Sequence, residues 1–112
     1  MYSMATVLTA DGAAFRLTET LKKESKVIQN LLDDFGGDGL VPLPNINSKI
    51  FKNILFFSHN QELEKYDDVK DVMIAADYIM YDTLVDHCAR HIAQVVIKGK
   101  TAEQIREYFK NT

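Results

Sequence analysis

The sequence predicts an α+β protein, in which a small N-terminal sheet is followed by several helices. Apolar runs flank Asp11-Gly12, and an Asp-Gly pair in that setting is a strong β-hairpin signal. A third short strand is expected at Leu40-Val41, immediately before two prolines. Most of the remaining chain shows apolar residues at helical spacing. Strands followed by a run of helices are typical of the α+β class.

The N-terminal third is expected to hold the hairpin and two helices. Residues 5–9 and 14–17 form the two strands, with residues 10–13 as their turn. Residues 18–25 fit a short helix. One helical face then follows, made of Val27, Ile28, Leu31, Leu32 and Phe35. The glycine-rich residues 36–39 end that helix in a loop.

The segment Leu40-Val41-Pro42-Leu43-Pro44-Asn45-Ile46 predicts a strand-to-helix corner. Each proline lacks a backbone donor, so the ladder is expected to end at the first of them. Asn45 and Asn47 can each accept a backbone N–H at a helix N-terminus. A helix over about 47–58 follows, with an apolar stripe of Ile50, Phe51, Ile54 and Leu55.

The C-terminal half predicts three more helices. Residues 59–68 form a polar connection, and a helix with Val69, Val72, Met73 and Ala76 inward runs to about residue 80. Asp82 is expected to cap the next helix. That helix buries Leu84, Val85, Cys88, Ala89, Ile92 and Val96. After a break at residues 97–100, Thr101 and Gln104 have capping-box spacing and begin a helix bearing Ile105, Tyr108 and Phe109.

Composition limits the classes of function. The 112 residues are 46% hydrophobic, enough for one packed core, and the net charge of -3 gives no basic footprint for nucleic acid. A single cysteine, Cys88, excludes an intrachain disulfide and favours a reducing compartment. The N-terminus lacks the pattern of a signal peptide, and no apolar run reaches the roughly 20 residues of a membrane span. A soluble intracellular protein is expected.

No pattern in the sequence predicts an active site or a cofactor. Gly99-Lys100-Thr101 resembles the end of a P-loop, but Gln94 stands where the first glycine of that motif is needed. His87 and His91 share a helix face, yet no further ligands complete a metal site. Cys88 falls on the expected core face, where a thiol is inert. The chain is therefore expected not to be an enzyme.

The helix over 47–58 carries more apolar surface than one core face requires. Phe56 and Phe57 widen its apolar arc, which core packing or a partner surface would each explain. The same two readings apply to Tyr78, Met80 and Tyr81 at one helix end. They apply as well to Tyr108 and Phe109 near the C-terminus.

Four motifs in order resemble the Skp family, the S-phase kinase-associated adaptors of SCF ubiquitin ligases and relatives of Elongin C. They are Ala10-Asp11-Gly12 with Phe15, Val41-Pro42-Leu43-Pro44-Asn45-Ile46, Ala75-Ala76-Asp77-Tyr78-Ile79, and Lys98-Gly99-Lys100-Thr101 with Glu103-Gln104-Ile105-Arg106. The resemblance covers residues 5–110. It implies a BTB/POZ-like fold over residues 1–96, with a small three-stranded sheet packed against several helices. Residues 97–112 would then begin the Skp-type helical extension.

The resemblance implies an adaptor that bridges a cullin scaffold to F-box proteins in the cytoplasm and nucleus, without catalysis or a cofactor. The implied cullin-binding residues are Asn53, Phe56, Phe57, Asp77 and Tyr78. The implied F-box-binding residues are Ile97, Lys98, Lys100, Thr101, Ile105 and Phe109. No nucleic acid or membrane partner is implied.

The chain departs from the family pattern in ways that bear on partners. Asp77 stands where the family has a cullin-facing Asn, and residues 59–68 replace a longer acidic insertion. The family normally continues beyond Thr112 with a helix that clamps the F-box. An exposed Ile105, Tyr108 and Phe109 would make the isolated chain self-associate. The alternative to the adaptor is thus a self-associating BTB/POZ-type structural protein that serves no ligase.

Overall fold

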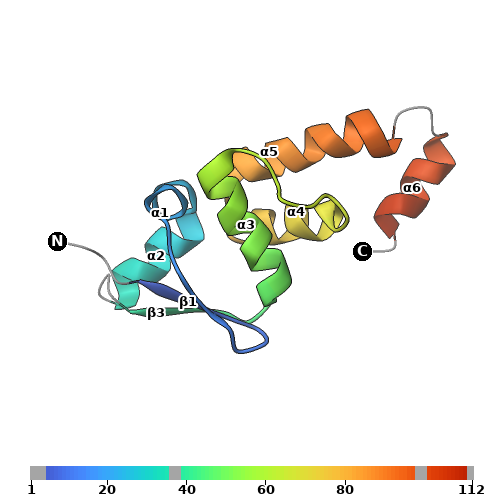
Figure 1. Ribbon diagram of the computed structural model, residues 1–112. Helices are drawn as coiled ribbons and strands as arrows, with labels where there is room; N and C mark the ends of the chain where they lie inside the picture. Colours follow the sequence, from blue (N-terminus) through green and yellow to red (C-terminus); the bar gives the residue numbers. More distant parts are fainter. Residues whose placement is uncertain (1–4, 36–38, 98–100, 111–112) are drawn as a thin grey trace.

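The computed structural model describes residues 5–35, 39–97 and 101–110, and it describes only the backbone of residues 35, 95–97, 105 and 108–110. Figure 1 shows the elements, whose bounds in chain order are β1 (Thr6–Thr9), β2 (Ala14–Arg16), α1 (Glu19–Glu24), α2 (Lys26–Phe35), β3 (Leu40–Leu43), α3 (Ser48–Asn60), α4 (Val69–Tyr78), α5 (Asp82–His91), η1 (Ile92–Ile97) and α6 (Ala102–Lys110). The predicted α+β class, with a small three-stranded sheet and several helices, is confirmed.

The sheet has β1 at its centre, in the order β2-β1-β3. β1 runs antiparallel to β2 and parallel to β3. The predicted hairpin is present: Gly12 has φ +84°, a conformation that glycine adopts without steric cost, and its N–H donates to the Thr9 carbonyl at 3.0 Å. The parallel pairing joins Thr6 to Leu40 and Thr9 to Leu43, so the Pro-rich segment lies beside the first strand.

The prediction that the prolines end the ladder was wrong. β3 runs from Leu40 through Pro42 to Leu43, and Pro42 pairs with Leu8. Among the described strands β3 pairs with β1 alone, so a residue without an N–H can be accommodated at this edge. Val41 and Leu43 are buried on the inner face, and Pro42 is exposed between them.

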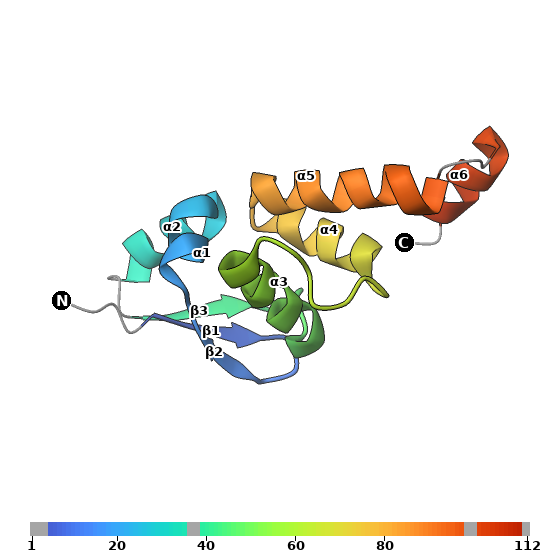
Figure 2. The same ribbon diagram turned by 45° about the horizontal axis from the view of Figure 1, so that its top comes forward.

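Helix α3 occupies the middle of the fold. Figure 2 shows the sheet below α3, with α1 and α2 covering the same face of the sheet and with α4 and α5 stacked beyond α3. Because α3 is packed on two sides, it buries residues around much of its circumference. Those residues are Ile50, Phe51, Asn53, Ile54, Phe57 and Ser58.

Side-chain caps fix several helix starts. Thr18 accepts from the Leu21 N–H at 3.0 Å, and Asn47 accepts from the Ile50 N–H at 2.9 Å. Asn47 is thus the cap of α3, and Asn45 is not. The predicted capping box is present, because the Thr101 hydroxyl accepts from the Gln104 N–H at 3.2 Å and the Gln104 amide accepts from the Thr101 N–H at 3.0 Å.

The predicted start of α5 needs correction. Tyr81 occupies the N-cap position without a side-chain hydrogen bond, and Asp82 is the first helical residue. The preceding turn is set by Met80, whose φ of 57° lies in the left-handed region. This turn buries the Tyr81 ring against Phe57, with ring centroids 5.7 Å apart. Core packing, rather than a carboxylate cap, therefore positions the start of the helix.

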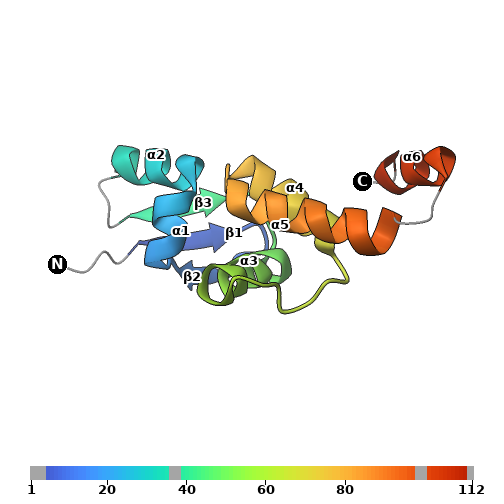
Figure 3. The ribbon, with the colours of Figure 1, turned by 90° about the horizontal axis from the view of Figure 1, so that it is seen from above.

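α5 continues directly into η1, a π-helical segment. The predicted boundary between the BTB/POZ-like core (residues 1–96) and the C-terminal extension (residues 97–112) falls within this segment. Figure 3 shows the resulting rod leading away from the sheet, with α6 beyond its far end. Ala89 is exposed on this rod, contrary to its predicted inward position, whereas Leu84, Cys88 and Ile92 are buried as predicted. In the ranges that the structure describes, the helices lack the combination of length and apolar character that crossing a bilayer requires.

Candidate protein-binding groove

Asn53, predicted as a cullin contact, is occupied inside the molecule. The side chain is 7% exposed, and its amide donates to the Lys65 carbonyl at 2.8 Å while its carbonyl accepts from the Glu64 N–H at 2.9 Å. The two hydrogen bonds attach the connection between α3 and α4 to the middle of α3. Asn53 therefore shapes a loop and offers little surface to a partner.

Phe57 belongs to the core. It is 2% exposed and packs against Tyr81 and against His87, whose ring centroid is 5.0 Å away. Phe56, beside it on α3, is half-buried. Of the two aromatic residues that widen the apolar arc of α3, Phe57 is thus used in packing against Tyr81 and α5.

Asp77 and Tyr78 lie at the end of α4 and remain exposed, Tyr78 at 44%. One turn earlier, Ile74 is 47% exposed, although the sequence pattern did not single it out. Ile74 and Tyr78 are four residues apart and so share one helix face. Two large apolar side chains side by side at the surface indicate a contact site.

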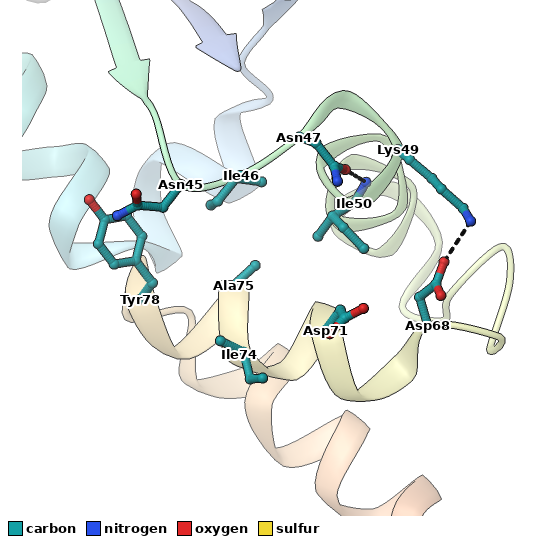
Figure 4. Close-up of a pocket in the computed structure, with 10 residues that line it drawn as sticks. All are labelled: Asn45, Ile46, Asn47, Lys49, Ile50, Asp68, Asp71, Ile74, Ala75 and Tyr78. Carbon is teal, nitrogen blue, oxygen red and sulfur yellow. Dashed lines mark hydrogen bonds and ion pairs between the residues drawn. The ribbon is translucent and has the colours of Figure 1, made fainter. Parts of the chain in front are cut away.

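Figure 4 shows that these two side chains line a groove between α4 and the segment that leads from β3 into α3. The groove has a volume of about 500 Å³. One wall comes from α4 and the residue before it, and the other from the corner and the first turn of α3. Its lining residues are Asn45, Ile46, Asn47, Lys49, Ile50, Asp68, Asp71, Ile74, Ala75 and Tyr78.

The groove is apolar at one end. Ile46, Ile50 and Ala75 are all buried and form its floor, and Ile74 and Tyr78 rise at its edge. The corner wall is held in place by the N-terminal hairpin, because the Asp11 carboxylate accepts from the Ser48 N–H at 2.9 Å and from the Ser48 hydroxyl at 2.5 Å. These bonds and the Thr9 hydroxyl lower the pKa of Asp11 to about 2.

The other end of the groove is charged. The Lys49 ammonium lies 2.9 Å from the Asp68 carboxylate and joins the first turn of α3 to the start of α4. The hydrogen bond and charge of Asp68, followed by the charges of Asp67 and Asp71, raise the pKa of Lys49. Two carboxylates, Asp68 and Asp71, and one ammonium therefore line this end of the groove.

The histidines and the cysteine of α5 are used structurally. The Tyr66 hydroxyl lies 2.9 Å from the His87 Nε2, and the Tyr66 ring stacks on His91 with centroids 4.3 Å apart. Burial raises the pKa of Cys88 to about 12, which keeps the thiol protonated and unreactive. Within the described part of the chain, no three His, Cys, Asp or Glu side chains are grouped so that they could hold a metal ion.

The sequence of the chain matches a known family. The model of the Skp1 family, tetramerisation domain, matches residues 3–62, which is more than half of the chain. The chain belongs to the Skp1 family. Membership supports an SCF adaptor role at the level of the family, which consists of adaptors rather than enzymes.

Curated Skp1-family relatives match nearly the whole chain. SKP1-like protein 1 of Oryza sativa subsp. japonica is 26% identical over 143 residues, which covers 95% of this chain and 82% of the rice protein. SKP1-like protein 1A of Arabidopsis thaliana is 29% identical over 129 residues and 90% of this chain, 80% of its own length. Both alignments are longer than the 112 residues of the chain, so these relatives contain residues that it lacks.

A solved structure shares the BTB fold. The BTB (Tramtrack and Bric a brac) domain of human Gigaxonin superposes with a TM-score of 0.67 and 22% identity, over 77% of this chain and 74% of that one. The likeness establishes the BTB/POZ-like architecture of this Skp1-family chain. It confirms the fold that the four sequence motifs implied.

The residues implied for F-box binding gather at the C-terminal end. Thr101 is exposed and caps α6. Lys98 and Lys100 lie outside the described residues, as do the side chains of Ile97, Ile105 and Phe109. The assignment of these six residues to F-box binding stays a prediction.

Sequence reasoning missed most of the groove. Ile74 was the available signal: it is a large apolar residue outside the inward set of its own helix, next to the singled-out Tyr78. Asn45 and Lys49 gave no such signal, because their place in the groove depends on how the corner packs against α4. Of the five residues predicted to bind a cullin, Tyr78 alone lines the groove.

Proposed function

We propose that this Skp1-family chain is the adaptor subunit of an SCF-type cullin-RING ubiquitin ligase, and that it binds the cullin N-terminal domain through the groove beside α4. The exposed pair Ile74 and Tyr78, at the edge of a groove with an apolar floor, is the observation that carries the proposal. Apolar and aromatic side chains around a concave site are typical anchors of protein interfaces.

The proposal narrows the set of cullin contacts. Asn53 and Phe57 are withdrawn from direct contact by their internal hydrogen bonds and ring packing. Tyr78 stays in the proposed surface, which gains Ile74, and Asp77 is kept as an exposed neighbour of Tyr78 that does not itself line the groove. Phe56 is half-buried on α3 and is not among the groove residues, so we assign it no direct role.

We further propose that F-box proteins bind the C-terminal end, through Ile97, Lys98, Lys100, Thr101, Ile105 and Phe109. The position of α6 supports this, because α6 follows the far end of the rod of α5 and η1 (Figure 3) and none of its described residues lines the groove. The two partners would then approach different parts of the chain, as a bridging adaptor requires.

Affinity measurements on three single variants test the cullin proposal. Ile74→Ala and Tyr78→Ala should each weaken binding to a cullin N-terminal domain by about tenfold, because each removes an anchor side chain worth about 1–2 kcal/mol. Leu40→Ala is the matched control, since Leu40 is 50% exposed on β3 and does not line the groove. If the wild-type chain binds no cullin domain, or if Leu40→Ala weakens binding as much, the groove is not the cullin site.

A self-associating BTB/POZ-type protein is the second candidate. The half-exposed Leu40 favours it, because β3 is an edge strand that pairs with β1 alone in the described sheet. Light scattering on the purified chain separates the candidates. A stable dimer that Leu40→Lys converts to a monomer, with no binding of a cullin domain, would support self-association in place of the adaptor role.

A further inference from the structure

The groove changes in character along α4. Asp71, Ile74 and Tyr78 line it at positions i, i+3 and i+7, and therefore lie along one face of the helix. Figure 4 shows Asp71 near the Lys49–Asp68 pair, and Tyr78 with Ile46 toward the other end. At a rise of about 1.5 Å per residue, Asp71 and Tyr78 are roughly 10 Å apart along the axis. An occupant therefore meets a carboxylate at one end and apolar side chains at the other.

The charged end of the groove is negative. Two carboxylates, Asp68 and Asp71, line it, and Lys49 is the one cation among its described lining residues. Lys49 is already bound to Asp68 at 2.9 Å. Asp71 is exposed and adds a negative charge that this pair does not balance. Asp67 extends the acidic surface just before α4.

We propose that the groove receives an amphipathic helix of the partner protein, which places a Lys or Arg opposite Asp71 and an apolar anchor against Ile74 and Tyr78. This rests on the proposed function and specifies the chemistry of the cullin segment that binds. A groove of about 500 Å³ lined along two helical turns matches one face of a helix. The basic and apolar side chains of the occupant are then about seven residues apart.

Charge complementarity selects a basic segment of a different protein over a second copy of this chain. The chain has a formal net charge of -3, so the long-range field between two copies is repulsive, whereas a basic segment of another protein is attracted to this acidic end. The negative charge of Asp71 attracts a partner helix that carries a Lys or Arg, and this attraction becomes a repulsion when residue 71 is made positive. Asp71 is thus a residue that selects among helices with similar apolar anchors.

The first experiment measures binding of a cullin N-terminal domain to Asp71→Asn and Asp71→Lys. We expect a loss of about threefold and about tenfold or more, respectively, with a smaller loss in high salt, because exposed charges are screened there. Asp33→Lys is the matched control, since Asp33 is an exposed acid on α2 outside the groove, and it should change affinity less than about twofold. Thermal unfolding checks that each variant is folded.

The second experiment needs no cullin. Two synthetic helical peptides of about 15 residues share leucine anchors and differ in one residue, a Lys or a Glu, placed two turns away. Titrated into the isotope-labelled chain, the Lys peptide should shift the amide signals of Ile74 and Tyr78 at about tenfold lower concentration than the Glu peptide. Asp71→Lys should reverse the preference.

The outcomes separate the two proposals. Where a cullin domain binds wild type and Asp71→Lys equally well, the inference about charge is wrong and the adaptor function stands. Where no cullin domain binds, the peptide titration decides. If the Lys peptide binds the groove more tightly than the Glu peptide, the groove does select a basic helix, but the partner that supplies this helix is not a cullin. Equal binding of the two peptides, or amide shifts outside the groove, would overturn the inference. A dimer that Asp71→Lys dissociates would identify a second copy as the occupant and also overturn it.

Discussion

Helices α3 and α4 both carry more apolar side chains than a single core face needs, and the structure uses the excess in opposite ways. α3 packs against α1 and α4, and Phe57 also contacts the rings of Tyr81 and His87, so this side chain is buried. α4 forms one wall of the groove, and its Ile74 and Tyr78 side chains lie at the edge of that groove, where they stay exposed. The number of apolar residues on a helix therefore does not identify a partner surface. Whether an apolar side chain can contact a partner depends on the direction in which it points relative to the elements packed around its helix.

The largest expected difference between the two helices is in stability. Phe57→Ala should lower the free energy of unfolding by about 3–5 kcal/mol, because it leaves a cavity between α3 and α5. Ile74→Ala should change it by less than about 0.5–1 kcal/mol, since the side chain is half-exposed. Urea unfolding of both variants measures this. Similar losses for the two would show that the Ile74 side chain contributes to the core as Phe57 does.

The second comparison concerns two asparagines near the start of α3, Asn45 before the helix and Asn53 within it. Asn53→Ala should cost about 1–3 kcal/mol, because the Lys65 carbonyl and the Glu64 N–H lose their buried partner. Asn45→Ala should cost less than about 0.5 kcal/mol, because Asn45 is exposed in the groove wall. Amide exchange of Glu64 reports the same contact directly. Unchanged protection of this amide in Asn53→Ala would contradict the role given to Asn53.

The smallest expected effect is a pH dependence at the far side of α3. Burial, and then the charge of His91, lower the pKa of His87, and the neutral ring can accept the Tyr66 hydroxyl proton at Nε2. Glu62 and Asp86 oppose this shift, and Arg90 adds to it. The folded state thus binds the proton less tightly than the unfolded one. The contribution of His87 is present above a pH of about 6.5 and is lost as the pH falls through the folded pKa.

His87→Gln tests this dependence, because glutamine keeps a hydrogen-bond acceptor and does not titrate. The variant should show a flatter fall in stability between about pH 7 and pH 5 than the wild type. Urea unfolding at several pH values measures the slope. A slope unaltered by the substitution would show that other groups cause the pH dependence.

The parts of the fold that depend on short-range chemistry were predictable. The Asp11-Gly12 turn, the Asn47 cap and the Thr101 capping box each involve residues within a few positions of one another. The end of β3 was mispredicted, because the tolerance for Pro42 depends on β3 being an edge strand. The edge position of β3 follows from the order of strands in the sheet, which cannot be read from the residues around Pro42.

The site was predictable only in part, and for the same reason. Tyr78 was found through its resemblance to a family motif, and it does line the groove. Asn53 and Phe57 were assigned to a partner through the family resemblance, and Phe57 also because it widens the apolar arc beyond one core face. The packing of α3 on two sides, visible in Figure 2, uses both of them internally. Burial on a central helix follows from the tertiary arrangement, which periodicity alone does not contain.

The hydrogen bonds from the first hairpin to the corner also bear on how the chain folds. The Ala10 N–H donates to the Ile46 carbonyl at 2.8 Å, and Asp11 holds Ser48, so residues more than thirty positions apart must meet before one groove wall exists. The parallel pairing of β1 with β3 spans a similar stretch of chain. Such long-range contacts form slowly, because the intervening chain must first lose its freedom. During synthesis the groove is therefore expected to be completed late, after the whole of α4 has emerged.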